Sequence, residues 1–199
     1  MSIVLLFAGP NGSGKSTITS RIQIIGEYVN ADLIAQDLPC SNEKAAEIAE
    51  ATREYFLKEN QDFTFESVLS TDRNIQLLQR AKEQNYTVAC IYVLTVNPSI
   101  NVQRVAKRVQ LGGHPVPKEK IVQRYHRALA LFPTLFSICD ELYVFDNSLD
   151  SNQGDSRLIL SCLNGNIKKF PNKIWSQEML DSLVSGSYPD KYLTNESGI

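Results

Sequence analysis

The most informative segment of this 199-residue chain is Ile3-Val4-Leu5-Leu6-Phe7-Ala8-Gly9-Pro10-Asn11-Gly12-Ser13-Gly14-Lys15-Ser16-Thr17. Its first part is apolar and predicts a buried strand, and the part from Gly9 on matches the phosphate-binding pattern G-x-x-x-x-G-K-[ST]. In such a loop the glycines let backbone N–H groups turn toward phosphate oxygens, and the lysine reaches the β- and γ-phosphates. The sequence therefore predicts a site for a nucleoside triphosphate.

The residues expected to bind the nucleotide are the polar and glycine positions of that loop. Isoleucines 18, 22 and 25 follow at helical spacing and predict that the loop opens a helix whose N-terminus faces the anion. The hydroxyl of Ser16 is the expected Mg²⁺ ligand. The alternative, a glycine-rich turn that binds nothing, explains neither the lysine nor the spacing. The set is Gly9, Asn11, Gly12, Ser13, Gly14, Lys15, Ser16 and Thr17.

Composition limits the classes of function. With 22 acidic and 20 basic residues, the net charge of −2 gives no general attraction for nucleic acid or an anionic membrane. No apolar run reaches the roughly 18 residues of a membrane span, and no cleavable leader is visible, so a cytoplasmic protein is expected. Cysteines 40, 90, 139 and 162 form no C-x-x-C pair, which favours reduced thiols over a metal site.

Strand and helix patterns alternate along the chain. This alternation predicts an α/β fold, a doubly wound, mainly parallel five-stranded sheet with right-handed crossovers and ligands at the carboxyl ends of its strands. After the first strand, the expected strands are 27–30, 63–69, 87–94 and 141–146, and the expected helices are 42–58, 74–84, 98–110 and 117–137.

We expect one domain. Residues 1–150 form its core, with a helical lid at about 98–137, and residues 151–199 form a small C-terminal extension of the same domain. In that extension the patterns predict a hairpin of 157–163 and 167–170 around Asn164-Gly165, a helix at 173–184, and a flexible tail from 185 to 199.

Two carboxylates follow or interrupt predicted strands. Asp32 comes just after the second strand, where it can accept the proton of an attacking substrate hydroxyl, or can merely cap the helix that starts at Leu33. Glu66 interrupts an apolar strand, where a charge is costly unless it faces a cleft or a cation. It is a candidate for binding substrate or orienting Mg²⁺-bound water, with an ordinary exposed position as the alternative.

Positive charge concentrates between Arg104 and Arg127, which includes seven cationic residues and one acid, Glu119. The segment from Gly112 to Pro117 separates its two helices and combines flexible glycines with rigid prolines, as in a hinge. This pattern predicts a lid whose arginines close over phosphates. A solvated basic face or an RNA-binding face is the alternative.

Asp146 ends an apolar run and so looks like a Mg²⁺-binding acid, but the following Asn147-Ser148 fits a turn near the nucleotide base better. Magnesium is then expected to depend on Ser16, the phosphates and water. Neither His114 nor His126 has a partner at metal-ligand spacing.

The assembled motifs resemble the zeta-toxin-like kinases, a P-loop kinase family. The resemblance is to a short member, because longer ones have a helical segment before the first strand. The matching residues span 3 to 148: the loop from Gly9 to Thr17, Asn30-Ala31-Asp32, Phe65-Glu66-Ser67, Arg104 to Arg108, Gly112-Gly113-His114, Arg124 to Arg127, and Phe145 to Ser148.

The resemblance implies transfer of the ATP γ-phosphate to a hydroxyl of a UDP-activated amino sugar. It implies that Asp32 is the base and binds the acceptor with Glu66, and that the lid arginines 108, 124 and 127 act with Lys15 in catalysis. We also expect Arg104 to bind substrate. An antitoxin is a further partner that the family suggests.

The leading hypothesis is therefore an ATP- and Mg²⁺-dependent small-molecule kinase. ATP is favoured over GTP because no guanine-selecting N/T-K-x-D motif is present. Two alternatives stay open: a regulatory ATPase that acts as a binding switch, and a nucleic-acid end kinase that uses the basic lid.

Overall fold

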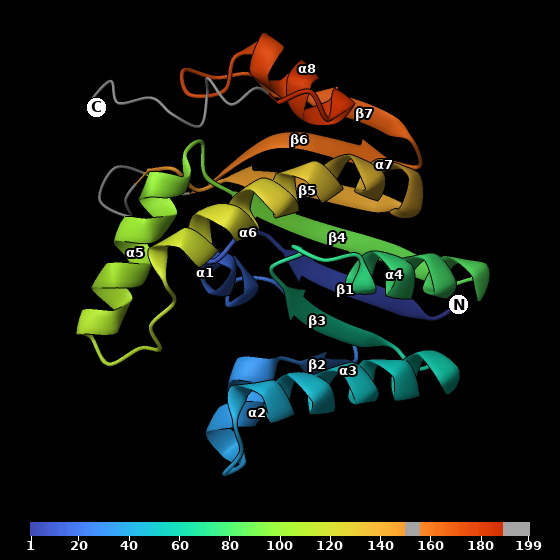
Figure 1. Ribbon diagram of the computed structural model, residues 1–199. Coiled ribbons are helices and arrows are strands. Elements are labelled where there is room, and N and C mark those ends of the chain that lie inside the picture. The colour runs from blue at the N-terminus through green and yellow to red at the C-terminus, as the bar shows by residue number, and fades with distance from the viewer. Residues whose placement is uncertain (150–155, 189–199) are drawn as a thin grey trace.

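The computed structural model describes residues 1–149 and 156–188. Its centre is one sheet of seven strands in the order β2-β3-β1-β4-β5-β6-β7 (Figure 1). The strands from β2 to β5 in this order are parallel, and β6 and β7 are antiparallel. Their bounds are β1 Ile3–Ala8, β2 Glu27–Val29, β3 Phe63–Ser67, β4 Thr87–Leu94, β5 Glu141–Asp146, β6 Arg157–Leu163 and β7 Asn166–Lys169.

The doubly wound, mainly parallel α/β fold is confirmed, but the expected count of five strands is wrong. The predicted hairpin around Asn164-Gly165 does form, as β6 and β7. It does not stand apart from the core: β6 pairs with β5 along its whole length, from Glu141 opposite Leu163 to Asp146 opposite Arg157. A strand that ends the parallel sheet has an open row of backbone groups, and this hairpin covers it.

Both faces of the sheet are covered, one by a large core cluster and the other by a smaller one. On β4, Val88, Cys90, Tyr92 and Leu94 point into the large core, which also holds helix side chains and Trp175. Ile91 and Val93 point into a smaller cluster on the opposite face with Leu5, Phe7 and Ile18. This is why the 87–94 run is apolar throughout rather than alternating.

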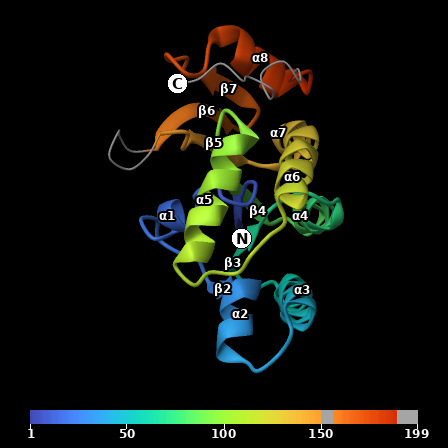
Figure 2. The same cartoon turned by 60° about the vertical axis from the view of Figure 1, so that its left-hand side comes forward.

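The helices follow the expected alternation. Their bounds are α1 Lys15–Thr19, α2 Ala31–Asp37, α3 Asn42–Lys58, α4 Arg73–Glu83, α5 Pro98–Gln110, α6 Lys118–Leu131, α7 Leu135–Ile138 and α8 Gln177–Ser185, with a 3₁₀ turn, η1, at Phe132–Thr134. Figure 2 shows α5 standing between α1 and α6. α1 and α5 lie at the end of the sheet where the parallel strands finish, and α6 runs from that end across one face of the sheet toward α7 (Figure 1).

Three helices differ from the sequence expectation. The first helix was expected to continue through Ile25, yet α1 ends at Thr19, and Ile22, Ile24 and Ile25 pack on the smaller core cluster from an irregular segment. The expected helix at 117–137 is broken at Pro133, which cannot donate a helical hydrogen bond, so α6 gives way to η1 and α7. The helix expected at 173–184 begins later, at Gln177, where Ser176 caps it.

The flexible tail predicted for 185–199 lies mostly outside the described residues, and residues 150–155 lie outside them entirely. Within the described ranges, no helix combines the length and apolar character that crossing a membrane requires.

Candidate active site

The phosphate-binding pattern occupies the turn between β1 and α1. Gly9 has φ of 141° and Gly12 has φ of 77°. A Cβ on Gly9 would lie 2.0 Å from the carbonyl oxygen of Val93, and one on Gly12 would lie 2.6 Å from that of Asn101. Backbone atoms cannot yield by such amounts, so both positions require glycine.

Two asparagines that lie outside the phosphate-binding pattern donate hydrogen bonds to backbone carbonyls of this loop. Asn101, fully buried on α5, donates from Nδ2 to the carbonyl oxygen of Asn11 at 2.7 Å and accepts a hydrogen bond from the Thr95 hydroxyl. Asn147, after β5, donates from Nδ2 to the carbonyl oxygen of Ser13 at 2.8 Å. The sequence analysis assigned no role to Asn101 or Thr95. The one available indication was that Asn101 is a polar residue one turn into an amphipathic helix.

The interior of the loop has the features of an anion site. The Ser13 hydroxyl is buried and has no hydrogen-bond partner among the described residues. The Lys15 ammonium folds back on the loop and donates to the carbonyl oxygens of Gly9, at 2.8 Å, and Pro10, at 3.3 Å. These are weak acceptors for a cation, so a phosphate oxygen is the better partner.

The electrostatic surroundings of Lys15 bring several predicted residues together. Burial lowers the pKa of the Lys15 ammonium, the nearby carboxylates of Glu66 and Asp32 raise it, and the Arg108 charge lowers it further. Glu66 pairs in register with Phe7 of β1, two residues before the phosphate-binding loop, and Asp32 follows β2, the neighbour of β3. Both carboxylates therefore lie at the edge of the sheet from which the loop with Lys15 starts.

Asp32 lies in the first turn of α2, immediately after β2. The residue that caps α2 is Asn30, whose Oδ1 accepts the N–H of Asp32 at 2.8 Å. The alternative role of Asp32 as the cap is therefore wrong. Its carboxylate is exposed at the carboxyl end of the sheet.

Glu66 lies near the end of β3 and is held by two hydroxyls. Its Oε1 accepts hydrogen bonds from Tyr28, at 2.7 Å, and Thr19, at 3.0 Å. Asn30 donates in turn from Nδ2 to the Tyr28 hydroxyl oxygen at 3.1 Å. Burial, with the Glu66 charge adding to it, raises the pKa of Tyr28, so the phenol stays protonated and can donate. Glu66 is thus no ordinary exposed residue.

The lid arginines occupy different positions. Arg124, on α6, donates to Oδ1 of Asn11 at 3.2 Å and so reaches the phosphate-binding loop. Arg108 donates to the carbonyl oxygen of His114 at 3.4 Å, and Arg127 is exposed. Their expected roles toward phosphate stay predictions.

Arg104 has a different set of partners. Its guanidinium donates to the carbonyl oxygens of Asn147, at 2.6 Å, and Leu149, at 2.8 Å. It therefore holds the loop after β5, the same loop from which Asn147 reaches Ser13. Substrate binding by Arg104 stays a prediction, and these contacts give it a structural task.

Asp146 fits the turn that the sequence suggested. It is 2% exposed, and its Oδ1 accepts from the Ser148 N–H at 3.0 Å and from the Ser148 hydroxyl. Among residues 1–149 and 156–188, no three His, Cys, Asp or Glu side chains group closely enough to hold a metal ion.

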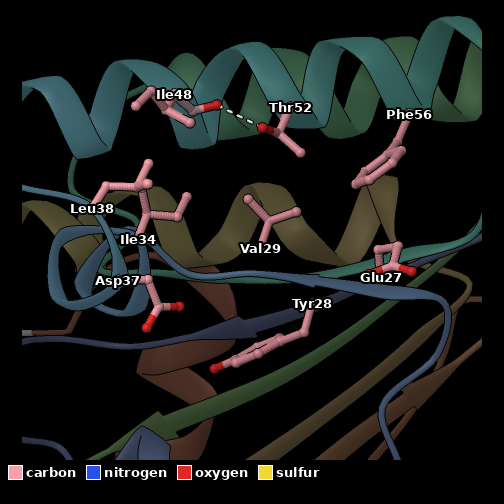
Figure 3. Close-up of a pocket in the computed structure, with 9 residues that line it drawn as sticks. All are labelled: Glu27, Tyr28, Val29, Ile34, Asp37, Leu38, Ile48, Thr52 and Phe56. Atoms are coloured by element: carbon pink, nitrogen blue, oxygen red, sulfur yellow. Dashed lines mark hydrogen bonds between the residues drawn. The ribbon is translucent and has the colours of Figure 1, made fainter.

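A separate cavity of about 320 Å³ lies between α2, α3 and strand β2 (Figure 3). Its walls are mainly apolar, with Val29 and Phe56 among them, and Glu27 and Asp37 at the margin. Figure 3 shows Ile48, Thr52 and Phe56 of α3 pointing across it toward β2. Tyr28 is shared between this cavity and the Glu66 contacts.

Comparison with known proteins agrees with this geometry. The family model described as zeta toxin matches residues 35–151, more than half of the chain. The chain belongs to the zeta toxin family. The match begins after the phosphate-binding loop, so the loop and the family match are independent observations. An uncharacterized protein of Haemophilus influenzae is 31% identical over 130 residues, which cover 61% of this chain and 91% of that protein.

Solved structures similar to this zeta toxin family chain show the same fold. The AvrRxo1-ORF1:-ORF2 complex with ATP superposes with a TM-score of 0.69 at 12% identity, over 94% of this chain and 64% of that one. The Streptococcus pneumoniae PezAT toxin–antitoxin system gives 0.59 at 14% identity, over 94% of this chain and 86% of that one. The chain thus spans less than two thirds of the AvrRxo1 protein.

Proposed function

We propose that this zeta toxin family chain is a kinase that transfers the γ-phosphate of ATP to a hydroxyl of a small molecule, with a UDP-activated amino sugar as the acceptor. Family membership and the phosphate-binding loop support the nucleotide half of the proposal. The likeness in fold to a complex solved with ATP is consistent with it.

The observation that carries the proposal is the position of Glu66 and Asp32 at the end of the sheet that bears the phosphate-binding loop. Glu66 pairs with Phe7 of β1 and Asp32 follows β2, and both carboxylates, with Arg108, act on the charge of Lys15. A phosphoryl-transfer site needs cations for the phosphates and a carboxylate for the attacking hydroxyl in one place. This arrangement supplies both at the carboxyl edge of the sheet, where such folds bind ligands.

The chemistry divides among the residues as follows. The acceptor oxygen attacks the γ-phosphorus, the bond to the β-phosphate oxygen breaks, and Asp32 takes the proton of the acceptor hydroxyl. Its exposure suits that task, because the substrate can approach the carboxylate directly. Lys15 and the lid arginines 108, 124 and 127 offset the charge that collects on the transferred group. Glu66 accepts a hydrogen bond from the acceptor.

Magnesium fits the donors present in one way. Ser16 lies on the first turn of α1 and its side chain is exposed, so its hydroxyl would hold the ion together with phosphate oxygens. The bound ion would neutralise phosphate charge.

The similarity to toxin–antitoxin systems motivates one further part of the proposal. PezAT is described as such a system, and the AvrRxo1 structures contain a second chain, ORF2. We propose that an antitoxin protein binds this chain as well.

The test is incubation with γ-labelled ATP, Mg²⁺ and UDP-N-acetylglucosamine, with mass spectrometry of the sugar nucleotide. The wild-type chain is expected to add one phosphate, whereas Lys15→Ala and Asp32→Asn lose transfer by about 10²- to 10⁴-fold. Asp32→Asn should keep its affinity for ATP, because Asp32 acts on the acceptor.

Asp37→Asn is the matched control, since Asp37 is an exposed aspartate at the other end of the same helix. It should leave turnover unchanged. Full turnover by Asp32→Asn would remove the proposed base, and no phosphorylated sugar from the wild type would remove the proposed acceptor.

A further inference from the structure

The hydrogen bonds to Glu66 belong to a network that also reaches the helix bearing Asp32. Tyr28 lies on β2 and Asn30 follows the strand directly. Because successive side chains of extended backbone alternate between faces, the side chains of Tyr28 and Asn30 point to the same face. Tyr28 pairs with Thr64 and Val29 with Phe65, so Glu66 follows one step beyond the paired residues. The register therefore brings Tyr28, Asn30 and Glu66 to the same corner of the sheet.

Each hydrogen bond in this network has a defined donor and acceptor. The Asn30 Nδ2 group donates to the Tyr28 oxygen at 3.1 Å, so the Tyr28 hydrogen is free to be donated to Oε1 of Glu66 at 2.7 Å. Thr19 has one hydroxyl hydrogen and two acceptors in reach, Glu66 Oε1 at 3.0 Å and the Lys15 carbonyl at 3.1 Å. Tyr28 therefore donates to the Glu66 carboxylate only, whereas Thr19 divides its one hydrogen between Glu66 and the Lys15 carbonyl.

Asn30 does two things with one amide. Its oxygen accepts the N–H of Asp32 at 2.8 Å, which fixes the first turn of α2, and its nitrogen holds the Tyr28 oxygen. Both hydrogen bonds to Glu66 end on Oε1, and Oε2 accepts none from the part of the chain that the structure describes. One carboxylate oxygen is thus fixed and the other is left for a substrate donor.

We infer that Tyr28 and Asn30 are positioning residues that fix the Glu66 carboxylate relative to the helix turn bearing Asp32. This inference rests on the proposed function, because it concerns the acceptor side of the same site. Tyr28 acts on substrate through Glu66, and Asn30 acts through Tyr28 and through the first turn of α2. Among the described residues, the side chains of Tyr28 and Asn30 bond to Glu66, to each other and to the Asp32 N–H rather than to the phosphate-binding loop, so we expect their substitution to change nucleotide affinity little.

Two substitutions separate positioning from simple structural support. Tyr28→Phe keeps the ring and removes the hydroxyl. Asn30→Ser keeps a side-chain cap for α2, because serine caps about as well as asparagine, but it is too short to reach Tyr28. Tyr143→Phe on β5 is the matched control, since its hydroxyl lies at 3.5 Å from Glu141 and away from the site.

The kinetic test uses ATP, Mg²⁺ and UDP-N-acetylglucosamine. Tyr28→Phe is expected to lower kcat/KM for the sugar nucleotide by about 10- to 100-fold, mainly through KM, as for loss of a hydrogen bond to a charged group. Asn30→Ser should lower kcat, because the turn that holds Asp32 loses its tie to Glu66. In both variants the Kd for nucleotide should stay within about twofold of wild type, a split that general loss of structure would not produce.

A second measurement needs no acceptor. In a double-mutant cycle of Tyr28→Phe and Glu66→Gln, the unfolding constants from urea titration should be coupled by about tenfold. A wild-type chain inactive on UDP-N-acetylglucosamine would count against the proposed acceptor, and the cycle would then decide the inference by itself. Absence of coupling, or an active wild type with unchanged kcat and KM in both variants, would overturn the inference.

Discussion

Asn101→Ala should weaken nucleotide binding although Asn101 touches no nucleotide in our account. The side chain is fully buried and donates to the Asn11 carbonyl at 2.7 Å. Truncation removes that bond and leaves the carbonyl without its partner. The Thr95 hydroxyl still has the Asn97 carbonyl at 3.2 Å, so it is not stranded.

The magnitude follows from one lost hydrogen bond whose acceptor, the part-buried Asn11 carbonyl, is left without it. This loss costs about 1–3 kcal/mol in the free energy of unfolding. The loop that presents Lys15 and Ser13 then loses the hydrogen bond from Asn101 to its backbone and keeps the one from Asn147. We expect a Kd for a non-hydrolysable Mg²⁺–ATP analogue about tenfold weaker than wild type, about 1.4 kcal/mol.

Urea unfolding and isothermal titration calorimetry measure the two quantities separately. Gln103→Ala is the matched control, because Gln103 is exposed on the same helix and should change stability by less than about 0.5 kcal/mol. Asn101→Asp keeps an acceptor for Thr95 but turns an oxygen toward the Asn11 carbonyl, so it should be at least as harmful. Wild-type stability and affinity in Asn101→Ala would show that the Asn101–Asn11 hydrogen bond does not support the nucleotide-binding loop.

Two further predictions concern the rest of the fold. Burial disfavours the Asp140 carboxylate, but hydrogen bonds from Lys82 and from the Val88 N–H, the latter at 2.9 Å, hold its pKa below the ordinary value. The stabilisation by the charged carboxylate is therefore present above the unfolded pKa of about 3.9 and is lost as pH falls through the folded pKa. The free energy of unfolding from urea titration should fall less between about pH 5 and pH 3 in Asp140→Asn than in the wild type. An equal fall in both proteins would contradict this prediction. Cys90, Cys139 and Cys162 are buried whereas Cys40 is half-buried, and burial raises the pKa of the Cys90 thiol. A thiol reagent should therefore label Cys40 first in the folded chain, and rapid labelling of a second cysteine before unfolding would show that the core is looser than described.

The sequence predicted the parts of the fold that depend on local pattern. The run 87–94 is apolar because both faces of β4 are covered, and the loop after β1 has a spacing that few other structures need. Glu66 was found because a charge inside an apolar strand requires a partner, and the structure supplies Tyr28 and Thr19.

The parts that the sequence missed depend on contacts between distant segments. Pairing of β6 with β5 follows from an open sheet edge, which no local pattern reports. Asn101 and Asn147 lie 90 and 134 residues from their partners in the loop, so their roles appear only after folding. The early end of α1 has the same origin, since the isoleucines after it reach the core from an irregular segment.

Binding of a nucleoside triphosphate through Lys15 is measured by titration calorimetry of Mg²⁺–ATP into the wild-type chain and Lys15→Ala. We expect one nucleotide bound per wild-type chain and an affinity at least about tenfold weaker in the variant, with both proteins unfolding at similar temperature. Equal affinities in the two proteins, or no binding by a folded wild type, would contradict this expectation.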